Sequence, residues 1–224
     1  PTLVKAGFSG AIYATPATRE HSAYMLRDCA HIQMYDAEFM NRKFADTEGW
    51  EPIEPIYDEE DAVRALMHFY AIPYRKAFAP IPGVSAMFID AGHILGSAAV
   101  VLDVTERGKT RRVVFSGDIG RKNLPIIRDP EMPPRPVDFV VMESTYGNRM
   151  HAEIATARSD LERVVKETVA AGGKVIIPAF AVGRTQEILY ELHELKREGK
   201  LPPVPVYIDS PLASHVTGVF RLHP

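Results

Sequence analysis

Short apolar runs alternate with glycine-rich polar segments along the first two thirds of the chain. Three of these runs have the length and composition of buried β-strands, and they cover residues 86–89, 113–115 and 139–142. A polar segment follows each run directly: Asp-Ala-Gly-His-Ile-Leu-Gly-Ser-Ala at 90–98, Ser-Gly-Asp-Ile-Gly at 116–120 and Glu-Ser-Thr-Tyr-Gly at 143–147. The pattern therefore predicts three strands that each end in a polar loop.

Helical periodicity and turn signals define the elements around these strands. A short buried strand over 10–15 precedes a helix that begins near Pro16 and reaches about Phe39. A second helix begins at Asp58, with acidic residues in its first turn. Residues 106–110 predict a hairpin turn between strands at 98–105 and 111–115, and the four prolines of 130–136 predict a loop.

The pattern changes near residue 148. Beyond it, helices are predicted over 156–171 and 183–198, and strands over 174–177 and 204–208. Such alternation is typical of a parallel sheet. We therefore place a domain boundary near residue 148. The chain starts at Pro1 rather than Met and closes on Arg-Leu-His-Pro without a helix or turn signal, so we expect an excerpt of a longer protein.

Three chemically active side chains follow the three strands. His93, Asp118 and Glu143 each come within a few residues of a strand end. If the strands neighbour one another in the same sense, these side chains meet at one rim of the sheet, where α/β proteins usually place their chemistry. Imidazole nitrogen and carboxylate oxygen are both zinc ligands. His93 and Asp118 are therefore candidate metal ligands.

Each of these residues also has a purely structural interpretation. His93 can be a hydrogen-bonded loop residue, Asp118 can belong to a turn and Glu143 can cap or pair at a strand end. A catalytic zinc uses about three protein ligands, yet no two of the eight histidines lie within five residues of each other. Either the metal site is incomplete in this chain or these residues are not ligands.

The composition indicates which kinds of partner and which compartment fit the chain. A net charge of −3 indicates no broad positively charged surface for binding nucleic acid, although a local basic groove is compatible with this charge. The single cysteine, Cys29, excludes an internal disulfide and fits a reducing cytoplasm, and its helical setting predicts a buried structural thiol. No apolar run of about 18 residues predicts a membrane span.

A further candidate lies at the start of the last predicted helix. Gly183 and Arg184 open this helix, and backbone amides together with a guanidinium can bind an anion there. A solvated arginine at a helix start is the equally weighted alternative. The phosphate-binding pattern Gly-x-x-x-x-Gly-Lys-Ser/Thr is absent from the sequence.

The motifs together resemble the β-CASP branch of the metallo-β-lactamase superfamily, a group of RNA- and DNA-processing nucleases. The resemblance covers nearly the whole chain. It rests on the three polar segments and on Gly-Ala-Ile-Tyr-Ala-Thr-Pro-Ala-Thr at 10–18, Leu-Arg-Asp-Cys-Ala-His-Ile-Gln at 26–33 and Pro-Ala-Phe-Ala-Val-Gly-Arg-Thr-Gln-Glu at 178–187. It implies an α/β fold: part of a metallo-β-lactamase αβ/βα sandwich over residues 1–148, then the start of a parallel-sheet β-CASP domain over residues 149–224.

The resemblance also implies roles for the site residues. His93 matches a histidine that binds one zinc, and Asp118 matches an aspartate that bridges two. Glu143 matches an acid that orients a general-acid histidine, so the expected catalytic residues are Asp118 and Glu143. The family's His-x-His-x-Asp-His signature and its two later histidine motifs are absent from this sequence. These 224 residues alone are therefore expected to be inactive.

The expected function is that of a zinc-dependent ribonuclease in RNA processing or decay, which hydrolyses phosphodiesters with a hydroxide that bridges two zinc ions. RNA, as a single strand, is the expected partner, with Arg184 as a candidate RNA contact. No membrane partner is expected, and a homodimer is a candidate assembly. Endonuclease and exonuclease modes both stay open. A noncatalytic scaffold in an RNA-processing complex is the alternative from another class, and hydrolysis of a small ester is a third.

Overall fold

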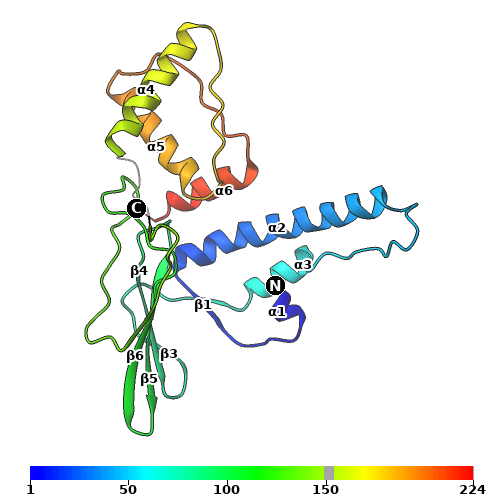
Figure 1. The fold of residues 1–224 in the computed structure, drawn as a ribbon, viewed down its shortest axis with the longest axis vertical. Coiled ribbons are helices and arrows are strands. Elements are labelled where there is room, and N and C mark those ends of the chain that lie inside the picture. Colours follow the sequence, from blue (N-terminus) through cyan, green and yellow to red (C-terminus); the bar gives the residue numbers. More distant parts are fainter. Residues whose placement is uncertain (149–153, 224) are drawn as a thin grey trace.

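The computed structural model describes residues 1–148 and 154–223. Figure 1 shows a sheet at one end, a long helix crossing its upper edge and a group of helices beyond it. The elements, in chain order, are α1 Thr2–Lys5, β1 Ile12–Ala14, α2 Pro16–Lys43, α3 Glu59–Leu66, β2 Phe69–Ala71, β3 Phe78–Ile81, β4 Val84–Asp90, β5 Ala98–Glu106, β6 Lys109–Phe115, β7 Phe139–Val141, α4 Ile154–Ala170, α5 Arg184–Arg197 and α6 Pro211–Phe220.

The main sheet confirms the predicted strands and hairpin. Its order is β3-β4-β5-β6-β7, antiparallel from β3 to β6, with β7 added parallel to β6. Because β5 runs antiparallel to both of its neighbours, β4, β6 and β7 all point in the same direction. Apolar side chains of β4, β5 and β6 form the buried core of the sheet: Ile89, Ala99, Val101 and Val114.

A separate pair of strands lies beside this sheet. β1 was predicted, and it pairs in parallel with β2, with Tyr13 opposite Tyr70. The sequence analysis missed β2, which has only three residues. β1 leads directly into α2, so the pair helps to fix where that helix begins.

Helix α2 begins at Pro16, as predicted, and ends at Lys43, four residues beyond the expected end at Phe39. The Thr15 hydroxyl accepts the Thr18 amide, and Pro16 occupies the first turn. Much of the helix projects away from the sheet (Figure 1). The prediction of a buried thiol is wrong, because Cys29 is exposed.

The segment after residue 153 is helical but does not form the predicted parallel sheet. Helices α4 and α5 match their expected ranges closely. Residues 174–177 and 204–208 form no strand, so the two strand predictions are wrong for this structure. A strand needs a hydrogen-bonded neighbour, and these stretches leave Ile176 88% exposed and Tyr207 85% exposed. The predicted boundary near residue 148 borders residues 149–153, which lie outside the described part.

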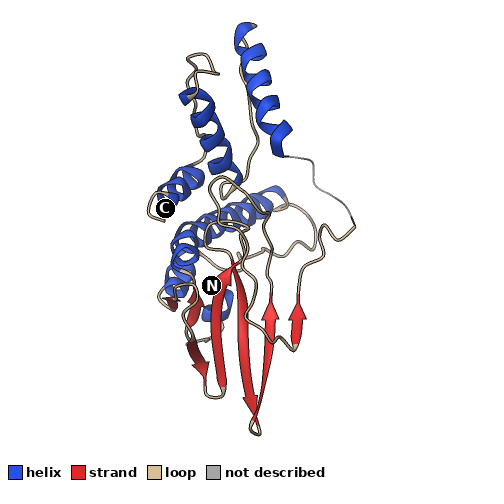
Figure 2. Ribbon diagram, turned by 90° about the vertical axis from the view of Figure 1, so that its left-hand side faces the viewer, coloured by secondary structure: helices blue, strands red, loops and turns tan. Residues whose placement is uncertain are grey.

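Helix α6 was not predicted, and it connects the C-terminal helices to α2. Ser210 caps it through the Ala213 amide, and Pro211 occupies its first turn. The ring of His215 stacks on Tyr24 of α2, with centroids 4.8 Å apart. Beyond the helix, His223 Nε2 lies 3.0 Å from Glu20 Oε2. Both contacts place α6 against the N-terminal half of α2 (Figure 2).

No helix within the described ranges is long and apolar enough to serve as a membrane span.

Candidate functional site

The three predicted site residues come together at one end of the main sheet. The loops after β4, β6 and β7 leave the sheet at the end that faces the C-terminal helices (Figure 2). His93 Nε2 lies 3.9 Å from Asp118 Oδ2. Glu143 Oε1 accepts the Ile119 amide at 2.7 Å, which places Glu143 beside Asp118. The prediction that these side chains gather at one rim is therefore confirmed.

The backbone of the His93 loop is held by groups that the sequence analysis did not identify. Ser97 Oγ accepts the amides of His93 at 3.0 Å and Ile94 at 3.3 Å. The Tyr74 hydroxyl donates to the Ser97 carbonyl at 2.8 Å. At the start of the loop, the buried Asp90 carboxylate accepts the Gly92 amide at 2.9 Å. These bonds fix the turn that presents the His93 imidazole.

The start of α2 holds the far side of the same loop. The hydroxyls of Thr15 and Thr18 both donate to the Gly96 carbonyl, each at 2.8 Å. Thr15 also caps α2 and is buried, so its position is set by the helix itself. The long helix therefore serves as an anchor for the loop that carries His93.

Two glycines let the His93 and Asp118 loops pack backbone against backbone. The Gly120 amide donates to the Ala91 carbonyl at 2.8 Å. A Cβ on Gly120 would lie 1.5 Å from the Gly92 carbonyl oxygen. Gly92 itself has a φ of +65°, and a Cβ there would lie 2.6 Å from the Pro130 nitrogen. No larger residue fits either position, so this contact sets the distance between the two loops.

The Asp118 loop is also joined to the Glu143 loop. Ser116 is buried, and its amide donates to the Val141 carbonyl at 2.9 Å, which continues the β6–β7 pairing. Its hydroxyl donates to the Gly117 carbonyl at 2.6 Å and accepts the Glu143 amide at 3.3 Å. Ser116 therefore connects the loops that carry the two carboxylates.

Hydrogen bonding and burial perturb the acids around the site in opposite directions. The Ile119 amide, the Thr145 hydroxyl and the nearby His93 together lower the pKa of Glu143. Burial raises the pKa of Asp90, although the Gly92 amide opposes this effect. Burial likewise raises the pKa of Tyr74, so its hydroxyl stays protonated as the donor to Ser97. Glu143 is thus an anion that braces the Asp118 turn.

The donor atoms of His93 and Asp118 fit a shared zinc ion as two of its ligands. Zinc binds imidazole nitrogen and carboxylate oxygen at about 2.0–2.2 Å, so donors 3.9 Å apart need little movement to reach one ion. Both side chains are exposed and face solvent. Within residues 1–148 and 154–223, no group of three or more His, Cys, Asp or Glu side chains is arranged to hold a metal. A catalytic zinc at this rim would need further ligands.

Arg184 lies at the first position of α5, close to the His93 loop. A Cβ on its neighbour Gly183 would lie 3.0 Å from Ile94 Cγ2, so the helix start touches the residue after His93. Arg184 Nη1 lies 3.0 Å from Glu187 Oε2, and its side chain is 65% exposed. The guanidinium is therefore in an exposed ion pair at the edge of the site.

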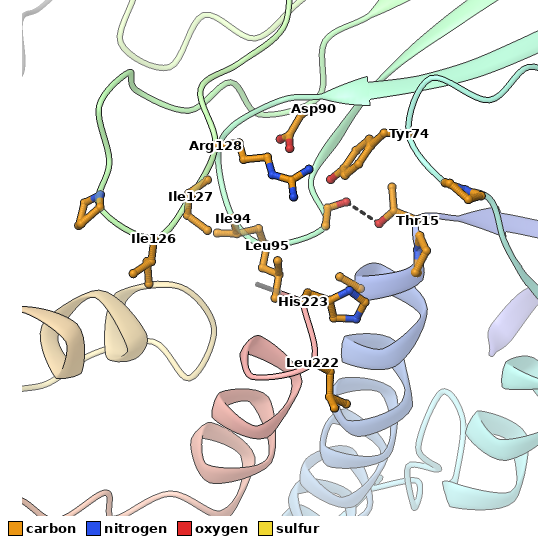
Figure 3. A pocket seen from close by; sticks show the side chains of 15 residues that line it. Thr15, Tyr74, Asp90, Ile94, Leu95, Ile126, Ile127, Arg128, Leu222 and His223 are labelled. Atoms are coloured by element: carbon orange, nitrogen blue, oxygen red, sulfur yellow. Dashed lines mark hydrogen bonds between the residues drawn. The ribbon is translucent and has the colours of Figure 1, made fainter.

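A cavity of about 580 Å³ lies behind the His93 loop. Figure 3 shows it between this loop, the start of α2 and residues 125–128. Its polar lining comes mainly from Thr15, Tyr74, Asp90, Arg128 and His223. Neither His93 nor Asp118 lines it, so the cavity is separate from the rim where these two side chains meet.

Comparison with known proteins identifies the family. The model of the Beta-Casp domain matches residues 185–224, which cover nearly all of α5 and the whole of α6. Ribonuclease TTHA0252 of Thermus thermophilus is 34% identical over 220 residues, 98% of this chain and 45% of that protein. The chain belongs to the β-CASP branch of the metallo-β-lactamase superfamily. The resemblance inferred from its motifs is therefore confirmed.

Other relatives of this β-CASP protein include a transcription termination factor and an RNase J-like protein. Transcription termination factor FttA of Methanosarcina mazei is 32% identical over 100% of this chain and 33% of its own length. The RNase J-like protein of Methanocaldococcus jannaschii is 39% identical over 73% of this chain and 38% of its own length. The chain therefore spans less than half the length of these relatives.

Proposed function

We propose that this chain forms part of a zinc-dependent ribonuclease that acts in RNA processing or decay. The observation that carries the proposal is the 3.9 Å approach of the His93 imidazole to the Asp118 carboxylate at the rim of the sheet. The glycine contact and the hydrogen bonds from Ser97 and Thr15 hold the loops in this geometry. An ordinary surface ion pair would not need such support. Such support is typical of ligands that must keep one orientation.

Each of the three site residues has a role in this proposal. His93 and Asp118 would hold zinc together with further ligands. When bound, zinc activates water for attack on phosphorus and polarises the phosphoryl oxygens. Glu143 positions the Asp118 turn through the Ile119 amide. In the complete site its carboxylate also orients the imidazole that protonates the leaving oxygen.

RNA is the proposed substrate because relatives that match nearly all of the chain are a ribonuclease and transcription termination factors. Arg184 is the proposed phosphate contact, since the start of α5 touches Ile94 beside His93. Binding a phosphate there would require the guanidinium to leave Glu187 or to share it. We place this activity in the cytoplasm, where a chain with one cysteine is kept reduced.

We further propose that residues 1–148 belong to the metallo-β-lactamase domain and residues 149–224 to the β-CASP domain. The Beta-Casp match lies wholly within the second range. The sheet with its site loops lies wholly within the first. RNA would then bind where α5 approaches the His93 loop.

The proposal is tested by measuring cleavage of a labelled single-stranded RNA by the full-length gene product. We expect cleavage that a chelator abolishes and that added zinc restores. The noncatalytic scaffold has one observation in its favour: the described residues contain no group of three or more His, Cys, Asp or Glu side chains that could hold a metal. It predicts RNA binding without cleavage at any zinc concentration, and that result would reject the nuclease proposal.

A further inference from the structure

His21 is a buried histidine without a hydrogen-bond partner at the contact between α2 and α6. Its side chain lies on the inner face of α2, and the residue is only 4% exposed. Neither ring nitrogen has a hydrogen-bond partner within the described part of the chain. The ring packs at a tilt against Phe220 of α6, with centroids 5.9 Å apart. Buried polar groups are normally hydrogen-bonded, so this arrangement is costly and unusual.

The surroundings of His21 tolerate the neutral imidazole and disfavour the charged one. Burial is the main cause that lowers the pKa of His21, and His223 lowers it further. Glu20, the neighbouring residue on α2, acts in the opposite direction but does not reverse the shift. Glu20 is also engaged by His223, whose Nε2 lies 3.0 Å from its carboxylate. A proton on His21 therefore gains no partner while Phe220 covers the ring.

Helix α6 is also hydrogen-bonded to the start of α5, which touches the His93 loop. The buried Gln186 of α5 donates to Thr217 Oγ1 of α6 at 3.0 Å and accepts the Gly183 amide at 2.8 Å. Gly183 in turn touches Ile94 beside His93. Movement of α6 away from α2 would thus be passed through Gln186 to the start of α5. That contact lies next to the candidate metal ligand.

We propose that His21 is an acid-sensitive latch that holds α6, and with it the start of α5, against the rest of the fold. At neutral pH the imidazole is uncharged and packs as an apolar ring under Phe220. On protonation His21 must reach water, and it does so by lifting α6 away from α2. This device is independent of the proposed ribonuclease function, because it needs only the packing of these two helices.

The sign of the pH dependence follows from the lowered pKa. The unfolded or undocked imidazole has a pKa of about 6.5, and the docked one lies below it. The open state therefore binds more protons between these two values. The stability of the docked state is complete above about pH 6.5 and falls as the pH drops through the window between the open and docked pKa values.

Amide hydrogen exchange of peptides from residues 211–220 tests the latch in the full-length gene product. Rates at about pH 7.5 and about pH 5.5 are compared after correction for intrinsic exchange. We expect protection of α6 to fall several-fold at the lower pH, and by no more than about tenfold, because the open-state imidazole, with its ordinary pKa of about 6.5, binds the proton more readily than the docked one. His21→Leu keeps an apolar side chain at this position and should make protection independent of pH.

Two further measurements separate His21 from its neighbours. His223→Gln should retain the fall in protection, because the buried group is unchanged. If His21→Leu fails to fold, NMR titration of the His21 ring in the unaltered protein is used instead of this variant. The expected titration midpoint lies below about pH 6.5, in the pH range where α6 loses protection. Equal protection at both pH values would overturn the proposal. So would a fall that persists in His21→Leu, or one that disappears in His223→Gln.

Discussion

Asp118→Asn is expected to abolish RNA cleavage by the full-length gene product and to leave most of its RNA affinity intact. An amide oxygen is neutral and would bind a zinc ion much more weakly than the Asp118 carboxylate. Loss of an outer partner of a metal ligand already costs 10–100-fold in activity or affinity, so loss of the ligand itself should exceed about 100-fold. Single-turnover cleavage and equilibrium binding of the same RNA measure the two effects separately. Asp46→Asn, an exposed aspartate after α2, is the matched control and should change neither.

Arg184→Ala should have the opposite signature. Removing a phosphate contact weakens binding and reduces the salt slope by about one unit, while single-turnover cleavage at saturating RNA changes less. Arg197→Ala is a close control, because Arg197 lies at the other end of α5, pairs with Glu194 and is 66% exposed, against 65% for Arg184. If both variants bind RNA as tightly as the unaltered protein, Arg184 is a solvated helix-start residue.

Near-normal cleavage by Asp118→Asn would refute the role of Asp118 as a metal ligand.

Gly120→Ala is expected to destabilise the fold and to separate the two site loops. Its methyl group would lie 1.5 Å from the Gly92 carbonyl oxygen, a backbone atom that no rotamer change can move. Overpacking of this kind typically costs 1–3 kcal/mol, and a backbone collision places the expected loss at about 3 kcal/mol. The Gly120 amide would also lose its bond to Ala91 as the loops move apart.

Urea unfolding of the full-length gene product measures this loss, and Gly218→Ala is the matched control. Gly218 lies within α6, and a Cβ there would have no heavy atom within 4 Å. Alanine is favoured over glycine in a helix interior, so this variant should be stabilised by about 0.5–1 kcal/mol. Equal stability of Gly120→Ala and the unaltered chain would show that the Gly92–Gly120 contact does not hold the site.

The gathering of His93, Asp118 and Glu143 could be predicted because it depends on local signals. Each residue follows an apolar run, and three runs in the same sense deliver their loops to one rim. The groups that hold these loops could not be found in this way. Thr15 lies 81 residues from Gly96, and Gly120 touches Gly92 only once the sheet has formed. Their bonds are properties of the folded chain that no sequence window contains.

The two failed strand predictions have a different cause. Residues 174–177 and 204–208 have strand-like composition, but a strand exists only with a neighbour to receive its hydrogen bonds. In the described residues these segments have no such neighbour. The exposure of Cys29 similarly depends on which face of α2 is covered, and helical periodicity alone does not decide that. Helix α6, in contrast, was detectable from the Ser210-Pro211 start signal.

The zinc content of the full-length gene product tests the central claim most directly. Zinc per polypeptide is measured by elemental analysis after dialysis, for the unaltered protein and for His93→Ala. His31→Ala is the control, because the His31 side chain is exposed and lies on α2, away from the candidate site. Bound zinc is expected in the unaltered protein and in His31→Ala, and a marked loss of zinc is expected in His93→Ala. Zinc that stays at full stoichiometry in His93→Ala would contradict the assignment of His93 as a ligand and with it the proposed metal centre.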